Sequence, residues 1–146
     1  MSAPGPRLYV AEPPVVYALR PPVVVDCSAI AAILFQEPLR DEAQIRIEGK
    51  ALHAPSLLDS EVASVALKKA RQDWPAESIS AAIDCYLDQA IELHRGDVSL
   101  QLELALRFEL SAYDAAYLAL AVQLRAPLVT FDRRLGEAAQ RALGEL

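Results

Sequence analysis

The chain has 146 residues and a net charge of −6 at pH 7; 53% of its residues are hydrophobic and 23% are charged. These values predict one folded domain and exclude an intrinsically disordered chain. The acidic balance does not favour nonspecific binding to nucleic acid, so such a partner must be bound through local chemistry. The chain shows no signal-peptide core and no apolar run long enough to span a bilayer, and Cys27 and Cys85 lack metal-ligand spacing. We therefore expect a cytoplasmic protein with reduced cysteines and no membrane segment.

The first 21 residues are expected to form a proline-rich extension, and residues 22–146 the folded domain. Prolines recur from Pro4 to Pro22 and prevent a helix in this segment. The apolar residues 8–10 and 15–19 are candidates for short edge strands, or for an arm that contacts a partner.

Strands and helices alternate through the rest of the chain. The expected strands are residues 23–25, 52–54, 90–94 and 128–131, and the last of these is predicted to be buried on both faces. The expected helices are residues 29–35, 39–48, 56 to about 74, 77–87, 98–108, 111 to about 125, and 133–143. Residues 98–108 also alternate as a strand would, but their length favours a helix. This order predicts an α/β domain with three α/β/α layers and a central, mainly parallel sheet.

Local signals place the starts and ends of several helices. Ser28 is predicted to be an N-cap, and Ser56 and Asp59 have the spacing of a capping box. The helix after Ser111 is apolar all round and is therefore expected to be buried on several sides, until Pro127 prevents its continuation.

Four carboxylates are expected at one edge of this sheet. Asp26 ends the first strand and Asp132 follows the last, while Glu61 and Asp114 lie in the first turns of two helices. In open parallel sheets, functional sites lie beyond the carboxyl ends of the strands, where these helices also begin. Crowded carboxylates repel one another, and a hard cation such as Mg²⁺ or Mn²⁺ removes that penalty. The sequence therefore predicts a divalent-metal site built from these acids.

Each acid also has a simpler explanation. Asp114 follows Ser111 with capping-box spacing, and Asp132 could cap the last helix. Asp26 could be a polar strand end, and Glu61 a solvated helix residue. The coincidence of all four at one edge favours the metal site over these separate roles.

The four acids lie in motifs that resemble those of a known family. VVVDCSAI around Asp26, APSLLDSEVASVALK around Glu61, LSAYDAAYLALA around Asp114 and LVTFDRRL around Asp132 resemble the acidic motifs of PIN-domain ribonucleases, most closely the VapC-type toxins of toxin–antitoxin pairs. The resemblance implies a PIN-like domain that hydrolyses RNA phosphodiesters with Mg²⁺ or Mn²⁺, through a water molecule activated by the metal. It also implies a homodimer and a cognate antitoxin that blocks the acidic pocket.

Other polar residues are candidates for supporting roles. Ser28 and Thr130 match small hydroxyl positions near the family's metal site, although they could equally be an N-cap and an ordinary strand residue. Lys68 lies on the same helix face as Glu61, and Arg133 and Arg134 follow Asp132, so these three are candidates for contact with RNA. A solvated surface role is the simpler explanation for Lys68.

His53 and His94 have no partner at ligand spacing, so the sequence predicts no histidine-based chemistry. The absence of a Gly-rich phosphate loop argues against a dinucleotide or P-loop enzyme. The leading hypothesis is thus a metal-dependent endoribonuclease toxin. The alternatives are a PIN-like module that binds RNA or protein without cleavage, and an enzyme that cuts DNA flaps or other phosphate esters.

Overall fold

The computed structural model describes Tyr9 and residues 20–146. The predicted edge strands at residues 8–10 and 15–19 lie outside the described residues, apart from Tyr9. The boundary between an extension and the domain therefore stays a prediction. Within the described part, no helix is both long and apolar enough to cross a membrane.

A four-stranded parallel sheet forms the centre of the domain, with the strand order β3-β2-β1-β4. The strands are β1 (Pro22–Val25), β2 (Ala51–Pro55), β3 (Glu92–His94) and β4 (Leu128–Val129). Val23, Val24 and Val25 of the central strand are at most 2% exposed, as expected for β-branched residues covered on both faces of a sheet.

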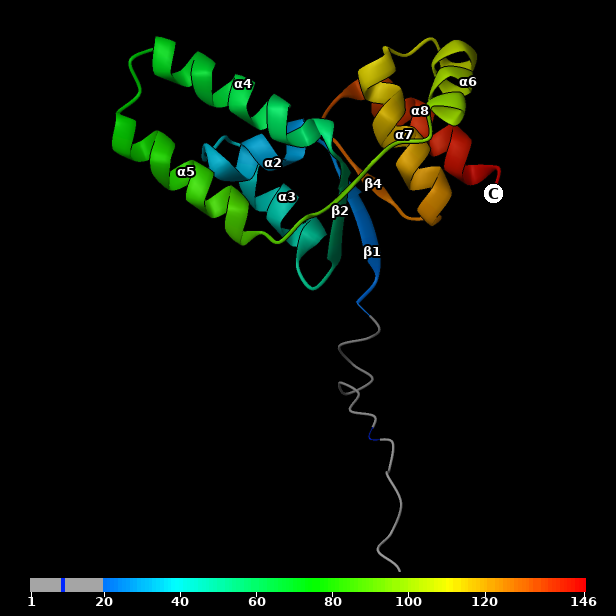
Figure 1. The fold of residues 1–146 in the computed structure, drawn as a ribbon, viewed down its shortest axis with the longest axis horizontal. Helices are drawn as coiled ribbons and strands as arrows, with labels where there is room; N and C mark the ends of the chain where they lie inside the picture. Colours follow the sequence, from blue (N-terminus) through cyan, green and yellow to red (C-terminus); the bar gives the residue numbers. More distant parts are fainter. Residues whose placement is uncertain (1–8, 10–19) are drawn as a thin grey trace, which may run out of the picture.

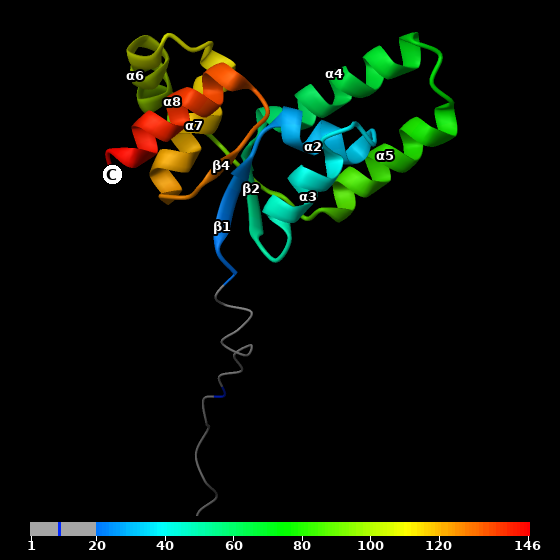
Figure 2. The same cartoon turned by 180° about the vertical axis from the view of Figure 1, so that it is seen from behind.

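Helices cover both faces of the sheet, as Figures 1 and 2 show from opposite sides. One layer contains α2 (Cys27–Leu34), α3 (Arg40–Ile47), α4 (Leu57–Arg71) and α5 (Ala76–Asp88), and the other contains α6 (Val98–Phe108), α7 (Ala112–Leu124) and α8 (Arg133–Gly144). This arrangement confirms the predicted three-layer α/β/α fold with a parallel sheet.

The fourth strand differs from its prediction. Residues 128–131 were expected to form a strand buried on both faces, but β4 has only two residues and lies at an edge of the sheet, half-buried. Thr130 and Phe131 leave the strand because they join hydrogen bonds with the start of α2. The apolar residues beside them pack against the core. Sequence pattern alone does not distinguish this packing from burial within the sheet.

Helix α7 is the central helix of its layer. Its residues from Ala115 to Ala121 are all buried, which confirms the prediction of a helix enclosed on several sides. The small alanine side chains allow the helix backbone to approach the sheet closely. Arg125 ends the helix in the left-handed conformation (φ 49°), and Pro127 prevents its continuation.

The N-termini of four helices meet at the carboxyl edge of the sheet. Helix α2 follows β1, α4 follows β2 and α8 follows β4, while α7 starts at the same end of the molecule (Figure 1). A helix N-terminus carries free backbone N–H groups and a partial positive charge, so this edge is favourable for negatively charged groups.

Candidate active site

Asp26 is the most buried acidic residue of this edge, with 6% of its surface exposed. It is the N-cap of α2, because its Oδ1 accepts a hydrogen bond from the backbone N–H of Ala29 at 3.0 Å. The hydroxyls of Ser28 and Thr130 donate to its Oδ1 and Oδ2 at 2.7 and 2.5 Å. Burial nevertheless outweighs these bonds and raises the pKa of Asp26, with a smaller contribution from Asp132.

Ser28 and Thr130 therefore hold the Asp26 carboxylate and also connect two distant segments. The Ser28 hydroxyl accepts a hydrogen bond from the backbone N–H of Phe131 at 2.9 Å, and the Thr130 hydroxyl accepts one from Asp132 N–H at 2.9 Å. The prediction that Ser28 is the N-cap of this helix is wrong. Asp26 occupies that position, which leaves the serine hydroxyl free to cross-link the two segments.

Glu61 lies on α4 and accepts a hydrogen bond of 2.6 Å from the hydroxyl of Tyr117 on α7. Burial raises the pKa of Glu61, the tyrosine hydrogen bond opposes this, and the nearby Asp26 and Asp114 charges add to the increase. Residue type and spacing do not identify Tyr117 as a site residue, because its position in an apolar helix resembles that of any core residue. Its 2% exposure and its bond to Glu61 show that it holds an acid of the edge in place.

Asp59, two residues before Glu61, points elsewhere. It accepts a hydrogen bond of 2.7 Å from the hydroxyl of Tyr86 on α5. The predicted capping box is wrong, because the Ser56 backbone is already helical (φ −56°, ψ −26°) and its hydroxyl donates to the carbonyl of His94 at 3.1 Å.

Asp114 and Asp132 begin two further helices. Ser111 caps α7 by accepting a hydrogen bond from Asp114 N–H at 3.1 Å, and Asp132 caps α8 by accepting one from Leu135 N–H at 2.9 Å. Burial raises the pKa of Asp114, and the charge of Asp132 raises it further, whereas Ser111 and Arg134 lower it. Asp132 and Ser111 therefore do act as helix N-caps. Capping does not explain why the charge of Asp132 lies close enough to raise the pKa of Asp114.

The charges of the four predicted acids influence one another at this edge. Asp132 acts on Asp26 and Asp114, and Glu61 is affected by Asp26 and Asp114. Within residues 20–146, no Lys, Arg or His side chain forms an ion pair with any of these four carboxylates. The edge therefore concentrates negative charge that the described residues leave largely uncompensated.

The cationic candidates take three different positions. Arg133 is exposed and pairs with Glu137 one turn along α8, at 2.9 Å. Arg134 donates to the Glu109 carbonyl at 2.6 Å and lowers the pKa of Asp114. Lys68 lines a groove beside the acids.

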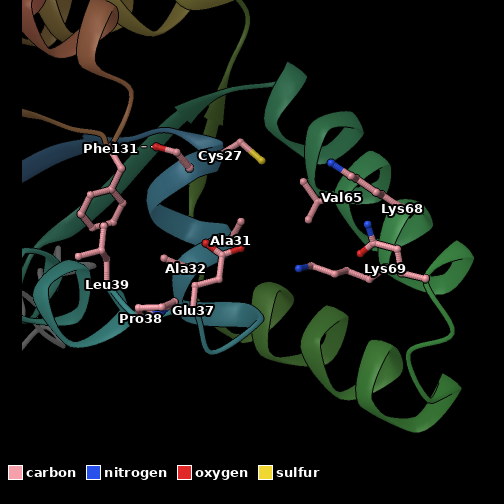
Figure 3. A pocket seen from close by; sticks show the side chains of 12 residues that line it. Cys27, Ala31, Ala32, Glu37, Pro38, Leu39, Val65, Lys68, Lys69 and Phe131 are labelled. Atoms are coloured by element: carbon pink, nitrogen blue, oxygen red, sulfur yellow. Dashed lines mark hydrogen bonds between the residues drawn. The ribbon is translucent and has the colours of Figure 1, made fainter.

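This groove lies between α2 and α4 and has a volume of about 490 Å³. Figure 3 shows Lys68 and Lys69 extending from α4 on one side, with Phe131 and Leu39 on the other. Ser28, which binds Asp26, also lines the groove, and Phe131 directly precedes Asp132. Lysine ammonium groups and a half-buried aromatic ring thus lie on the surface that leads to the acids.

The fold and the site together define the class of this protein. It is a three-layer α/β protein with a parallel sheet and with interacting carboxylates at the carboxyl ends of its strands. The sequence profile of the PIN domain matches residues 23–140. The chain is 35% identical over 119 residues to Ribonuclease VapC9 of Mycobacterium tuberculosis and to VapC ribonuclease Mb0985 of Mycobacterium bovis, covering 81% of this chain and 91% of each relative. It is 32% identical over 123 residues to Ribonuclease VapC3 of Pyrobaculum aerophilum, covering 79% of this chain and 92% of that relative.

The chain therefore belongs to the PIN-domain family, as its motifs predicted. Its fold is also similar to the crystal structure of PAE2754 from Pyrobaculum aerophilum, with a TM-score of 0.59 and 21% sequence identity over 86% of this chain and 91% of that chain. This similarity supports the architecture described above.

Proposed function

We propose that this protein is a divalent-metal-dependent endoribonuclease and the toxin of a type II toxin–antitoxin pair. One observation carries the proposal: the charges of Asp26, Glu61, Asp114 and Asp132 act on one another at one edge, and none of the four carboxylates forms an ion pair within residues 20–146. The similarity to VapC ribonucleases supports RNA as the substrate.

The donor set fits a hard divalent cation. PIN nucleases generally depend on such ions, and carboxylate oxygens are the ligands that Mg²⁺ and Mn²⁺ prefer. Mg²⁺ is the expected ion, and Mn²⁺ should replace it. When bound, the cation would activate water for attack on phosphorus and stabilise charge on the departing oxygen.

The chain's own residues orient this donor set. Asp26 accepts two hydrogen bonds at Oδ1 and one at Oδ2, so a lone pair of Oδ2 stays available for a cation. Tyr117 restrains Glu61, and the helix caps restrain the start of α7 and Asp132. Such restraint lowers the cost of ordering the ligands when the cation and RNA bind.

The groove beside the acids fits a single strand of RNA. Single-stranded nucleic acids are bound by cationic grooves that follow the phosphates and by aromatic rings that stack with bases. Lys68 would contact phosphate and Phe131 would contact a base, whereas the ion pair of Arg133 with Glu137 leaves it a weaker candidate. Arg134 would limit the negative potential at Asp114 as the RNA backbone approaches.

Incubation of the purified protein with end-labelled RNA tests the proposal. We expect cleavage with Mg²⁺ or Mn²⁺, none with EDTA, and none with Asp26→Asn or Asp114→Asn, provided that both variants remain folded by circular dichroism. RNA binding without cleavage under any metal would instead support the non-cleaving module, and cleavage of DNA alone would exclude an endoribonuclease. Persistent cleavage in EDTA would contradict the metal mechanism.

The antitoxin is expected to place an Arg or Lys side chain against the four carboxylates, because a cation there replaces the charge of the metal. Mn²⁺ affinity should therefore fall strongly in the complex. Unchanged Mn²⁺ affinity would show that the antitoxin inhibits elsewhere.

A homodimer is supported by an apolar row on α6. Val98, Leu102 and Leu106 follow one another at intervals of four residues and are 75%, 59% and 73% exposed. Residues at this spacing share one helix face, so their exposure suits burial against a second copy. Light scattering should give about twice the 15.9 kDa chain mass, and Leu102→Glu should give the monomer. A wild-type monomer at micromolar concentration would contradict the dimer.

A further inference from the structure

The two histidines of the chain, 41 residues apart, meet at the β2–β3 edge of the sheet. His53 Nδ1 lies 2.9 Å from His94 Nε2. Parallel pairing places His53 opposite Glu92, and His94 follows two residues later on the same face of β3. Sheet register, which sequence spacing does not reveal, therefore creates this cluster.

The Glu92 carboxylate faces both rings without forming a normal hydrogen bond. Its Oε2 is 3.5 Å from His53 Nδ1 and its Oε1 is 4.0 Å from His94 Nε2. One ligand atom from each of the three residues lies within 4.8 Å of the others. The rings are tilted by 42° with centroids 5.1 Å apart, so their edges converge and they do not stack.

These distances match a transition-metal site. Two nitrogens bonded to one tetrahedral Zn²⁺ at about 2.0–2.1 Å lie about 3.3 Å apart, so the two facing nitrogens, 2.9 Å apart in the metal-free pair, need to separate by only about 0.4 Å. The His53 and His94 side chains are 13% and 25% exposed, so their positions are largely fixed, while Glu92 is 68% exposed and can move toward an ion. Two imidazoles and one carboxylate prefer Zn²⁺, Co²⁺ or Ni²⁺ over Mg²⁺.

We propose that His53, Glu92 and His94 form a second metal site, specific for ions of the Zn²⁺ class and separate from the acidic site. The site fastens the short edge strand β3 to β2. It also lies beside the start of α4, because the His94 carbonyl accepts hydrogen bonds from Ser56 N–H and Ser56 Oγ at 2.9 and 3.1 Å. Three protein ligands leave one position of a tetrahedral ion to water, and the bound ion would stabilise the edge from which the Glu61 helix starts.

The geometry also determines which ring nitrogens carry hydrogen. In the neutral metal-free pair, one of the two facing nitrogens donates to the other, so both rings can be Nδ1–H or both Nε2–H tautomers. A bound ion requires both facing nitrogens to be free of hydrogen. His53 then becomes the Nε2–H tautomer and His94 the Nδ1–H tautomer, without net release of a proton from the pair.

The test uses the full chain without a histidine tag, treated with chelator and then held in excess Mg²⁺ so that the acidic site does not compete. Calorimetric titration with ZnCl₂ should give one equivalent of micromolar or tighter binding. His53→Asn and His94→Gln should each weaken it at least about tenfold, and Glu92→Gln should weaken it less. Glu77→Gln, which changes an exposed acid at the start of α5, is the matched control and should bind as wild type.

Nitrogen NMR of the two imidazoles provides the independent readout. We expect saturating Zn²⁺ to give opposite tautomers in the two rings, and to raise the melting temperature of wild type but not of His94→Gln. Unchanged imidazole signals with one equivalent of Zn²⁺ would overturn the proposal. Zn²⁺ binding that survives both histidine variants would overturn it as well, and would leave the cluster as a hydrogen-bonded pair.

Discussion

Two tyrosines hold two carboxylates of the same helix, and the comparison between them tests the acidic site. Tyr117 donates to Glu61 at 2.6 Å and Tyr86 donates to Asp59 at 2.7 Å. Both rings are buried, at 2% and 7% exposure, and both carboxylates lie within the first turns of α4. The variants Tyr117→Phe and Tyr86→Phe therefore remove the same kind of hydrogen bond, but only one of these bonds faces the proposed metal site.

The expected losses of stability are of similar size. A hydrogen bond to a charged group contributes about 1.5–3 kcal/mol, and water reduces this value where the carboxylate is accessible. We expect about 1.5 kcal/mol for Tyr117→Phe, because Glu61 is half-buried, and about 1 kcal/mol or less for Tyr86→Phe, because Asp59 is exposed. For a chain of this size, these values correspond to a decrease in melting temperature of about 2–6 °C. Urea unfolding in EDTA measures both variants.

The two variants should differ in function. Loss of a residue that orients a metal ligand typically reduces metal affinity or activity by about 10–100-fold, so we expect that reduction in kcat/KM for Tyr117→Phe alone. The Tyr117 hydroxyl also lowers the pKa of Glu61, so its removal should move the acidic limb of the pH–rate profile to higher pH. Equal activities and equal pH profiles in the two variants would refute a role of Tyr117 in positioning Glu61.

Three further predictions follow from the same edge. Asp114→Asn should abolish RNA cleavage and most of the Mn²⁺-induced increase in melting temperature, whereas Asp59→Asn should preserve both. Equal cleavage and equal Mn²⁺-induced increases in the two variants would show that Asp114 does not belong to the site. Lys68→Ala should raise KM with little change in kcat, and should reduce the slope of log affinity for RNA against log salt concentration by about 0.7. The control Lys50→Ala, which lies just before the first residue of β2 and so at the opposite edge of the sheet, should leave KM and this slope unchanged. Acids with raised pKa values bind protons more tightly in the folded state than in the unfolded state. The free energy of unfolding in EDTA should therefore decrease as pH rises from the ordinary carboxyl pKa of about 4 through the raised pKa values of the folded state. Mn²⁺ or Asp114→Asn should flatten this dependence, and a metal-free protein that becomes more stable over that range would contradict the repulsion.

The sequence allowed prediction of the layers and of the shared edge, because both follow from rules that act over short stretches. Strand and helix patterns gave the order of elements, and parallel connections then required Asp26 and Asp132 to follow strands at the same edge. Helix α6 was also predicted with its observed bounds, Val98–Phe108. Its apolar residues alternate as they would in a strand, and the length of the segment is what favoured a helix.

The errors concern side chains with more than one available partner. Ser28 and Ser56 both have the residue type of an N-cap, yet their hydroxyls bind Asp26 and the His94 carbonyl. The position of a serine in the sequence does not determine which of these partners its hydroxyl reaches in the folded chain. For the same reason, residue type alone did not identify Tyr117 as a partner of Glu61.

The same limit explains why the histidine cluster was not predicted. Metal-ligand spacing is recognised in sequence when the ligands share one turn or one helix, whereas His53 and His94 belong to different strands. Their approach depends on the register in which Pro55 pairs with His94, and a shift of one residue would move one side chain to the other face. The pattern of β3, only three residues long, does not determine that register.

The two proposed sites place opposite demands on the fold. At the carboxyl edge, the acids repel one another in the metal-free chain, and the hydrogen bonds of Ser28, Thr130 and Tyr117 limit the cost without removing the charge. A weakly held hard cation suits this edge, because RNA must enter and leave while the ion exchanges its waters. At the β2–β3 edge, the histidine rings already satisfy each other by a hydrogen bond, so the metal-free state carries little repulsion. An ion there would bind a nearly preformed site and would be retained, as its proposed stabilising role requires. Chelation should therefore remove activity quickly through the acidic site and lower stability more slowly through the histidine site.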